Sequence, residues 1–62
     1  MYRVKEKRKE LGWSQEVLSE KSGVSRAIIS ALETDDSAQT SVGTLIKLGN
    51  AFGCRVADIF VA

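Results

Sequence analysis

Arg26 is the one residue of the segment 25–33 whose side chain can form a bidentate pair with a guanine. Its guanidinium could donate parallel hydrogen bonds to guanine O6 and N7, a contact that gives about 1–3 kcal/mol of discrimination between bases. The same planar group could instead pair with a backbone phosphate. It could also remain a solvated surface charge. Since the sequence leaves these three interpretations open, the surrounding residues must show what Arg26 can meet.

The residues beside Arg26 have the spacing of a helix that is apolar on one side. Counting about 100° per residue from Ile29 as the buried direction, Ala27 and Ala31 point outward, whereas Leu32 borders the inward side. If this helix entered a major groove, the outward alanines could offer only a methyl contact or allow close approach. The residues then expected nearest to base edges are Arg26, Ala27, Ser30 and Ala31.

Ile28 lies on one shoulder of this helix, opposite Ser30. A β-branched apolar residue beside a polar face typically packs at the edge of the core, and this is the favoured interpretation. Contact with a thymine methyl group or with a partner protein remains the alternative. Ile28 is therefore kept among the candidate DNA-binding residues.

Two serines and one glycine position this segment. Ser14 and Ser25 each precede a helical pattern and can accept a hydrogen bond from a free backbone N–H, which stabilises a helix by about 1 kcal/mol. Gly23 can adopt a positive φ between the two helices. The result is the outline of a helix-turn-helix over about residues 14–33, a motif whose second helix can lie in the DNA major groove. Both serines are also candidates for a secondary contact with phosphate.

The rest of the chain predicts further helices and no strand, since no alternating pattern of any length appears. Helices are expected at about residues 3–11, 14–21, 25–33, 41–52 and 56–60. Val4, Arg8 and Leu11 share the inward face of the first. The core stripe of the fourth comprises Leu45, Leu48 and Phe52, flanked by Ile46 and Ala51. We therefore expect an all-α single domain, residues 1–62, of five short helices around one core.

The composition excludes several classes of function. The chain has no His and one Cys, so it offers no zinc site and no internal disulfide. No Gly-rich phosphate loop is present, and 62 residues are too few to enclose a substrate pocket, so neither an enzyme nor a cofactor is expected. No membrane span or signal peptide is evident, which favours a cytoplasmic protein. The net charge of +1 is low for a nucleic-acid-binding protein, although five of the first nine residues are basic.

Trp13 and Cys54 have structural explanations. Trp13 precedes the capping Ser14 and is expected to pack on the core near Val17 or Leu18. Cys54 lacks a second cysteine that could resolve an oxidised thiol, so an inert buried thiol is favoured over a redox switch.

Two stretches resemble the Cro/repressor (Xre-type) helix-turn-helix family, WSQEVLSEKSGVSRAIISALE and TLIKLGNAFGCRVADIF. The family pattern has Gln after the capping Ser, Gly in the turn, a small capping residue, then buried Ile and Leu before a closing Glu. The matching residues here are Gln15, Gly23, Ser25, Ile29, Leu32 and Glu33. The resemblance covers nearly the whole chain and implies a lambda-repressor-like fold.

The resemblance also implies roles for individual residues. Gln15, at the N-terminus of the second helix, is expected to contact phosphate and to steady the third helix; helix N-termini attract phosphate in any case. Arg8 and Glu33 are expected to form a partly buried ion pair. Thr34, just beyond the third helix, is a weaker phosphate candidate.

Three departures from the family pattern are present, the first being that the outward positions of the third helix have few hydrogen-bonding side chains. Ser19 stands where the family usually has Ala, a change in size that is expected to be harmless. The loop after the third helix, TDDSAQT, is acidic where the family's is basic. Asp35 and Asp36 would repel phosphate if they pointed toward DNA.

The sequence thus predicts a sequence-specific DNA-binding transcriptional regulator, a repressor, whose partner is double-stranded DNA. Because a domain of this size offers only about 600–1,000 Å² to DNA, a homodimer on a palindromic operator is expected. Its interface would involve the fourth and fifth helices and exposed apolar residues such as Val61. No small-molecule substrate and no membrane partner are expected. The alternatives are a protein-interaction module, or an antitoxin, that kept the fold with weak DNA binding.

Overall fold

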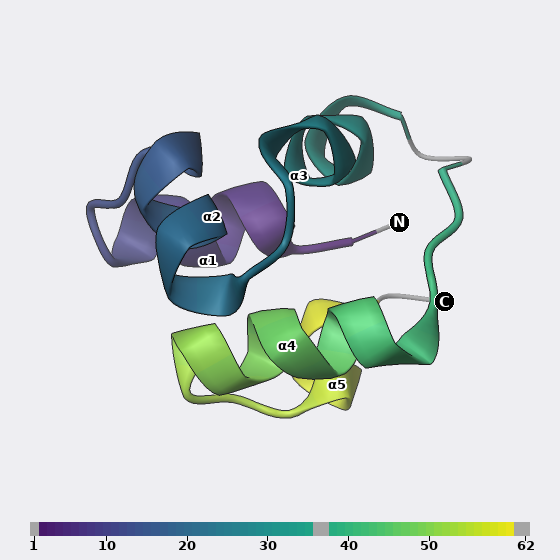
Figure 1. Ribbon diagram of the computed structural model, residues 1–62. Helices are drawn as coiled ribbons and strands as arrows, with labels where there is room; N and C mark the ends of the chain where they lie inside the picture. The colour runs from purple at the N-terminus through teal and green to yellow at the C-terminus, as the bar shows by residue number, and fades with distance from the viewer. Residues whose placement is uncertain (1, 36–37, 61–62) are drawn as a thin grey trace.

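The computed structural model describes residues 2–35 and 38–60, which form five helices and no strand (Figure 1). The helices are α1 (Val4–Glu10), α2 (Gln15–Ser22), α3 (Arg26–Thr34), α4 (Val42–Phe52) and α5 (Val56–Ile59). Their ends lie within one residue of those expected from the sequence. The predicted all-α fold is confirmed.

Serine side chains start three of the helices. The Oγ atom of Ser14 accepts the backbone N–H of Val17 at 3.1 Å, and that of Ser25 accepts the N–H of Ile28 at 3.3 Å. Ser41 caps α4 in the same way. Each bond satisfies one of the N–H groups that a helix leaves free in its first turn.

The core is a single cluster of apolar side chains drawn from all five helices and the turn before α3. The buried residues are Val4, Leu18, Val24, Ile29, Leu32, Leu45, Leu48 and Ile59. Burial of each such side chain contributes about 1.5–3 kcal/mol relative to exposure. Figure 1 shows the arrangement that results, with α4 and α5 forming one side of the molecule and α1, α2 and α3 the other.

Two residues expected at the core lie at the surface. Leu11 is 46% exposed because the last turn of α1 tightens: its N–H bonds to the carbonyls of both Lys7 and Arg8, at 3.3 and 3.2 Å. The tighter turn changes the rotation per residue, so Leu11 leaves the inward face predicted for it. Ile46, expected to flank the core stripe of α4, is 48% exposed because Leu45 and Leu48 occupy the inward direction.

Trp13 packs against the core, as predicted, and it also joins two distant segments. Its ring stacks on Phe52 at the end of α4, with centroids 6.0 Å apart and planes 18° apart. The ammonium group of Lys21 lies 5.2 Å from the centroid of the Trp13 ring. Phe52, predicted in the core stripe, is consequently half-buried.

The connection between α4 and α5 passes directly over the backbone of α4. A Cβ atom at Gly49 would lie 2.8 Å from the carbonyl oxygen of Cys54, closer than real Cβ contacts. Gly49 is therefore needed for this close approach. The Cys54 thiol is half-buried, and burial raises its pKa above the ordinary value, which agrees with an inert thiol.

The two ends of the described chain meet. The N–H of Arg3 donates to the carbonyl of Ile59 at 2.7 Å, and Tyr2 and Phe60 form an isolated antiparallel bridge. Their rings meet edge to face, with centroids 5.5 Å apart. This contact fixes α5 against the start of α1.

Candidate nucleic-acid interface

Helix α3 has one face in the core and the opposite face in solvent. Ile29 is fully buried and Leu32 is 4% exposed, whereas Ala27 and Ala31 are exposed. This is the orientation that the sequence predicts. The helix thus has a slim, small-residue surface that no described part of the protein covers.

Ile28 is also part of this exposed surface. Its side chain is 40% exposed, and it does not belong to the residues packed against the core. The favoured interpretation from the sequence, packing at the core edge, was therefore wrong. Ile28 is about 100° around the helix from Ile29, on the shoulder between the buried and the exposed face.

The polar side chains of α3 lie around this surface and not at its centre. Arg26 is exposed in the first turn, where α3 carries no acidic residue. Ser30 is half-buried on the shoulder opposite Ile28. Arg26 is therefore the charged group available to a ligand at the N-terminal end of α3.

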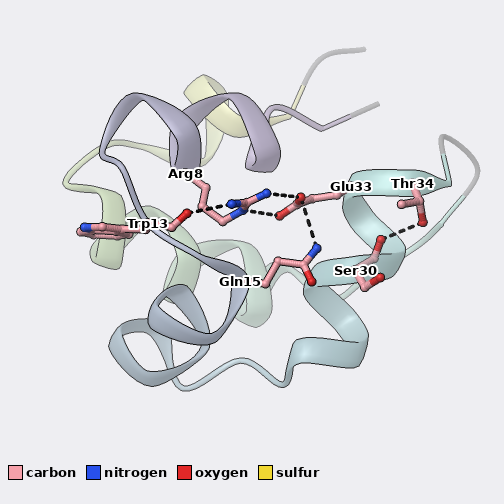
Figure 2. Close-up of polar contacts among 6 residues, drawn as sticks. All are labelled: Arg8, Trp13, Gln15, Ser30, Glu33 and Thr34. Atoms are coloured by element: carbon pink, nitrogen blue, oxygen red, sulfur yellow. Dashed lines mark hydrogen bonds and ion pairs between the residues drawn. The ribbon is translucent and has the colours of Figure 1, made fainter.

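Thr34 is poorly suited to the phosphate contact suggested for it. Its hydroxyl donates a hydrogen bond to the backbone carbonyl of Ser30 at 2.8 Å, so its proton is already engaged (Figure 2). Thr34 is also the last residue of α3, where the helix dipole is negative and disfavours an anion. Asp35 follows it and is exposed, whereas Asp36 lies outside the described residues.

The N-termini of α2 and α3 are the better phosphate candidates. Ser14 and Ser25 use their oxygens as caps, which leaves each hydroxyl proton able to donate. The first backbone N–H groups of both helices have no intrahelical partner. The two termini differ in charge: α2 has the acidic Glu16 in its first turn, whereas α3 begins with Arg26. The α3 terminus should therefore attract phosphate more strongly.

Arg8, Glu33 and Gln15 form a hydrogen-bonded network between these helices (Figure 2). Arg8 donates from Nε to Glu33 Oε2 and from Nη2 to Glu33 Oε1, both at 2.9 Å. Gln15 Nε2 donates to the same Oε1 at 3.3 Å. The Glu33 side chain is only 2% exposed and that of Arg8 13%. The ion pair and the steadying contact of Gln15 that the resemblance implied are thus both present.

The network also reaches the connection between α1 and α2. Arg8 Nη1 donates to the carbonyl of Trp13 at 2.7 Å, next to the capping Ser14. The hydrogen bonds that Arg8 donates to Glu33 raise the pKa of Arg8, against the opposing effect of burial. A permanently charged, bidentate Arg8 therefore holds α1, the start of α2 and the end of α3 in one geometry.

The turn between α2 and α3 has polar contacts that the sequence did not reveal. Gly23 ends α2 with φ +76°, a left-handed conformation that favours glycine. The Ser19 hydroxyl donates to the carbonyl of Val24 at 2.7 Å, and Ser22 Oγ accepts the Val24 N–H at 3.1 Å. Ser19, predicted to be a harmless replacement, thus fixes the residue just before the α3 cap.

The described residues contain no group of three potential metal ligands, enclose no pocket, and include no helix long and apolar enough to cross a membrane. Val61, suggested for a dimer interface, lies outside the part of the chain that the structure describes. The candidate site consists of Arg26 and the small exposed residues of α3 together with the N-termini of α2 and α3.

Comparison with known proteins identifies the family of this chain. A family model described as helix-turn-helix matches residues 4–59, which includes all five helices. The chain is also similar to a Bacillus subtilis protein described as an uncharacterized HTH-type transcriptional regulator, YgzD. The two are 38% identical over 58 residues, covering 94% of this chain and 86% of that protein. No solved structure matches the chain.

Proposed function

This chain belongs to the Cro/repressor-type helix-turn-helix family of DNA-binding regulators, and from that premise we propose that it is a non-catalytic, sequence-specific repressor. In the proposal it binds a palindromic operator as a homodimer. The observation that carries this proposal is the geometry of α3. Ile29 and Leu32 bury one face, while the opposite face with Ala27 and Ala31 stays open to a ligand.

In the proposed complex, α3 enters the major groove and the N-termini of α2 and α3 face the backbone phosphates. Arg26 is the residue proposed to reach a guanine edge. The network of Arg8, Glu33 and Gln15 supports this placement because it fixes the start of α2 against the end of α3. Such a regulator acts where the chromosome is, so we place it in the cytoplasm.

The homodimer is supported by the size of the domain and by its exposed apolar residues. The Cα atoms extend over 24 × 21 × 20 Å, less than the roughly 34 Å between half-sites one helical turn apart. One copy can therefore cover one half-site. Val42 is 67% and Ile46 48% exposed on α4, and Phe60 is 44% exposed after α5. These residues are the proposed contact between two copies.

A protein-interaction module, or an antitoxin that combines both roles, is the second candidate. Exposed Ile28 on the outward surface of α3 and acidic Asp35 at its end favour it. The low net charge of +1 also fits weak DNA binding. In this case the α3 surface would contact a protein partner.

Selection of duplexes from a random pool, followed by titration at several salt concentrations, separates the two candidates. A repressor should select one palindromic sequence. A plot of its log Kd against the log of the salt concentration should have a slope of about 0.9 per phosphate contacted. Sedimentation should show two copies on the selected duplex. Micromolar binding without sequence preference would instead favour the interaction module.

Exchange of Arg26 for Ala tests its proposed role on the selected duplex. Loss of discrimination at one base pair, by about 1–3 kcal/mol, is expected if Arg26 reads a guanine. Equal weakening on all duplexes would mean a phosphate contact instead. Arg55→Ala is the matched control, because Arg55 lies at the start of α5 with an 88% exposed side chain.

A further inference from the structure

The centre of the outward surface of α3 consists of apolar side chains. Ala27, Ile28 and Ala31 are all exposed, and together they define what we call the methyl face. Ala27 and Ala31 are four residues apart and Ile28 is three before Ala31, so the three lie side by side on the helix. None of these side chains can donate or accept a hydrogen bond.

The hydrogen-bonding side chains of α3 do not lie at the middle of its outward surface. Arg26 is the first residue of α3 and so lies at the N-terminal end of the surface. Thr34 is at the other end, and its hydroxyl donates to the Ser30 carbonyl. Ser30 itself is half-buried on one shoulder. A ligand that meets the middle of α3 therefore meets mainly methyl groups.

One base presents a matching group in the major groove. Thymine presents a C5-methyl group there beside its O4 acceptor, whereas the edges of the other bases carry donors and acceptors without a methyl group. Burying apolar surface against apolar surface is favourable, but covering a donor or acceptor with carbon leaves that group without a partner. Apolar side chains thus discriminate in favour of thymine and against guanine and adenine edges.

We propose that the methyl face recognises the C5-methyl groups of thymines, so that the operator is read largely through 5-methylpyrimidines. This inference rests on the proposed entry of α3 into the major groove. From Ala27 to Ala31 the helix rises by about 6 Å, at about 1.5 Å per residue. Because base pairs are spaced by about 3.4 Å, the face spans two to three successive positions. Each half-site accordingly contains a short run of thymines, on either strand.

Replacement of thymine by uracil in the selected operator tests the inference directly. Uracil keeps the O4 acceptor and the pairing with adenine but lacks the methyl group. At two or three positions of each half-site, the exchange should raise Kd by about fourfold per thymine, the effect of losing one buried methyl-sized group. Exchanges outside these positions should leave Kd unchanged. Cytosine in place of thymine should weaken binding, and 5-methylcytosine should restore part of the loss.

Exchange of Ile28 for Ala separates methyl contact from any effect of uracil on the DNA itself. Alanine favours helix, so the variant is expected to fold. Its binding should no longer distinguish thymine from uracil at one position of the half-site. Leu11→Ala is the matched control, because Leu11 is 46% exposed but lies at the end of α1. This variant should preserve the ratio of Kd between uracil and thymine duplexes at every position.

The outcomes distinguish the inference from the function on which it rests. A duplex bound specifically but insensitive to uracil at every position would overturn the methyl contact and leave the DNA-binding function intact. A selected half-site without a run of thymines would do the same. If the pool yields no preferred duplex, the proposed function fails and the inference fails with it.

Discussion

The α1–α3 part of the molecule adds a network of polar side chains to the apolar core that it shares with the α4–α5 part. In the first, Arg8, Gln15 and Glu33 join three helices through hydrogen bonds of defined direction. In the second, Leu45, Leu48 and Ile59 pack in the core, and the backbone crosses Gly49 at close range. Directional bonds determine orientation, whereas apolar packing contributes mainly stability. The part that faces DNA in our proposal is thus the part whose geometry is most constrained.

The largest loss of stability should follow from Leu48→Ala in α4. Leu48 is fully buried, and removal of such a side chain costs about 2–5 kcal/mol because a cavity remains. For a domain of 62 residues this is a large share of the total stability. Urea denaturation monitored by circular dichroism measures the change. Lys47→Ala, on the exposed side of α4, is the control and should change stability by less than about 0.5 kcal/mol.

Glu33→Ala should cost about 3 kcal/mol, because it leaves the Arg8 guanidinium largely buried without its partner. An effect of less than about 1 kcal/mol, as for an exposed pair, would contradict a structural role. The double variant Arg8→Met, Glu33→Leu sharpens the comparison. Apolar replacement of a buried pair is often neutral for stability, so this variant should fold. It should nevertheless bind the selected duplex more weakly, because Gln15 and the start of α2 lose their attachment to α3.

Features that depend on residues at fixed offsets could be predicted from the sequence. Ser14 and Ser25 as caps, and Gly23 in the turn, follow from local backbone chemistry alone. The outward direction of Ala27 follows from helical periodicity. The contact between Arg8 and Glu33 is 25 residues apart in sequence, and only the family resemblance suggested it.

Features that depend on small changes of backbone path could not be predicted. The tightened last turn of α1 moves Leu11 to the surface, and periodicity gives no sign of it. Whether Ile28 is covered depends on the position of other elements, which helical spacing does not contain. The Ser19 hydroxyl meets the Val24 carbonyl only after Gly23 has reversed the chain. In each case the deciding factor is tertiary placement.

Ser19→Ala tests whether that last contact matters for the turn. Loss of the hydrogen bond to Val24 should destabilise by about 1 kcal/mol, partly offset by the higher helix propensity of alanine. Ser30→Ala is the matched control. Ser30 is also half-buried within a helix, and its side chain makes no hydrogen bond among the described residues. The difference between the two variants in the free energy of unfolding, measured by urea denaturation, gives the contribution of the hydrogen bond from Ser19 to Val24. Equal stabilities would show that Ser19 is the harmless replacement that its size suggests.

The smallest effect concerns Cys54, in the connection between α4 and α5. Burial raises the pKa of this thiol, while the charge of Lys7 on α1 lowers it and that of Asp58 raises it. The pKa of the thiol is higher in the folded protein than in the unfolded chain. Its contribution to the free energy of unfolding is therefore fully present at pH values below the pKa of the unfolded chain. It is lost as pH rises through the folded pKa.

The rate of alkylation of Cys54 by iodoacetamide should increase with pH at a higher midpoint in the native protein than in urea, because the folded-state pKa is raised. Lys7→Gln should move the native midpoint higher still, because it removes the positive charge on α1 that lowers the pKa of Cys54. If the native and unfolded midpoints coincide, the thiol is solvated in the folded protein.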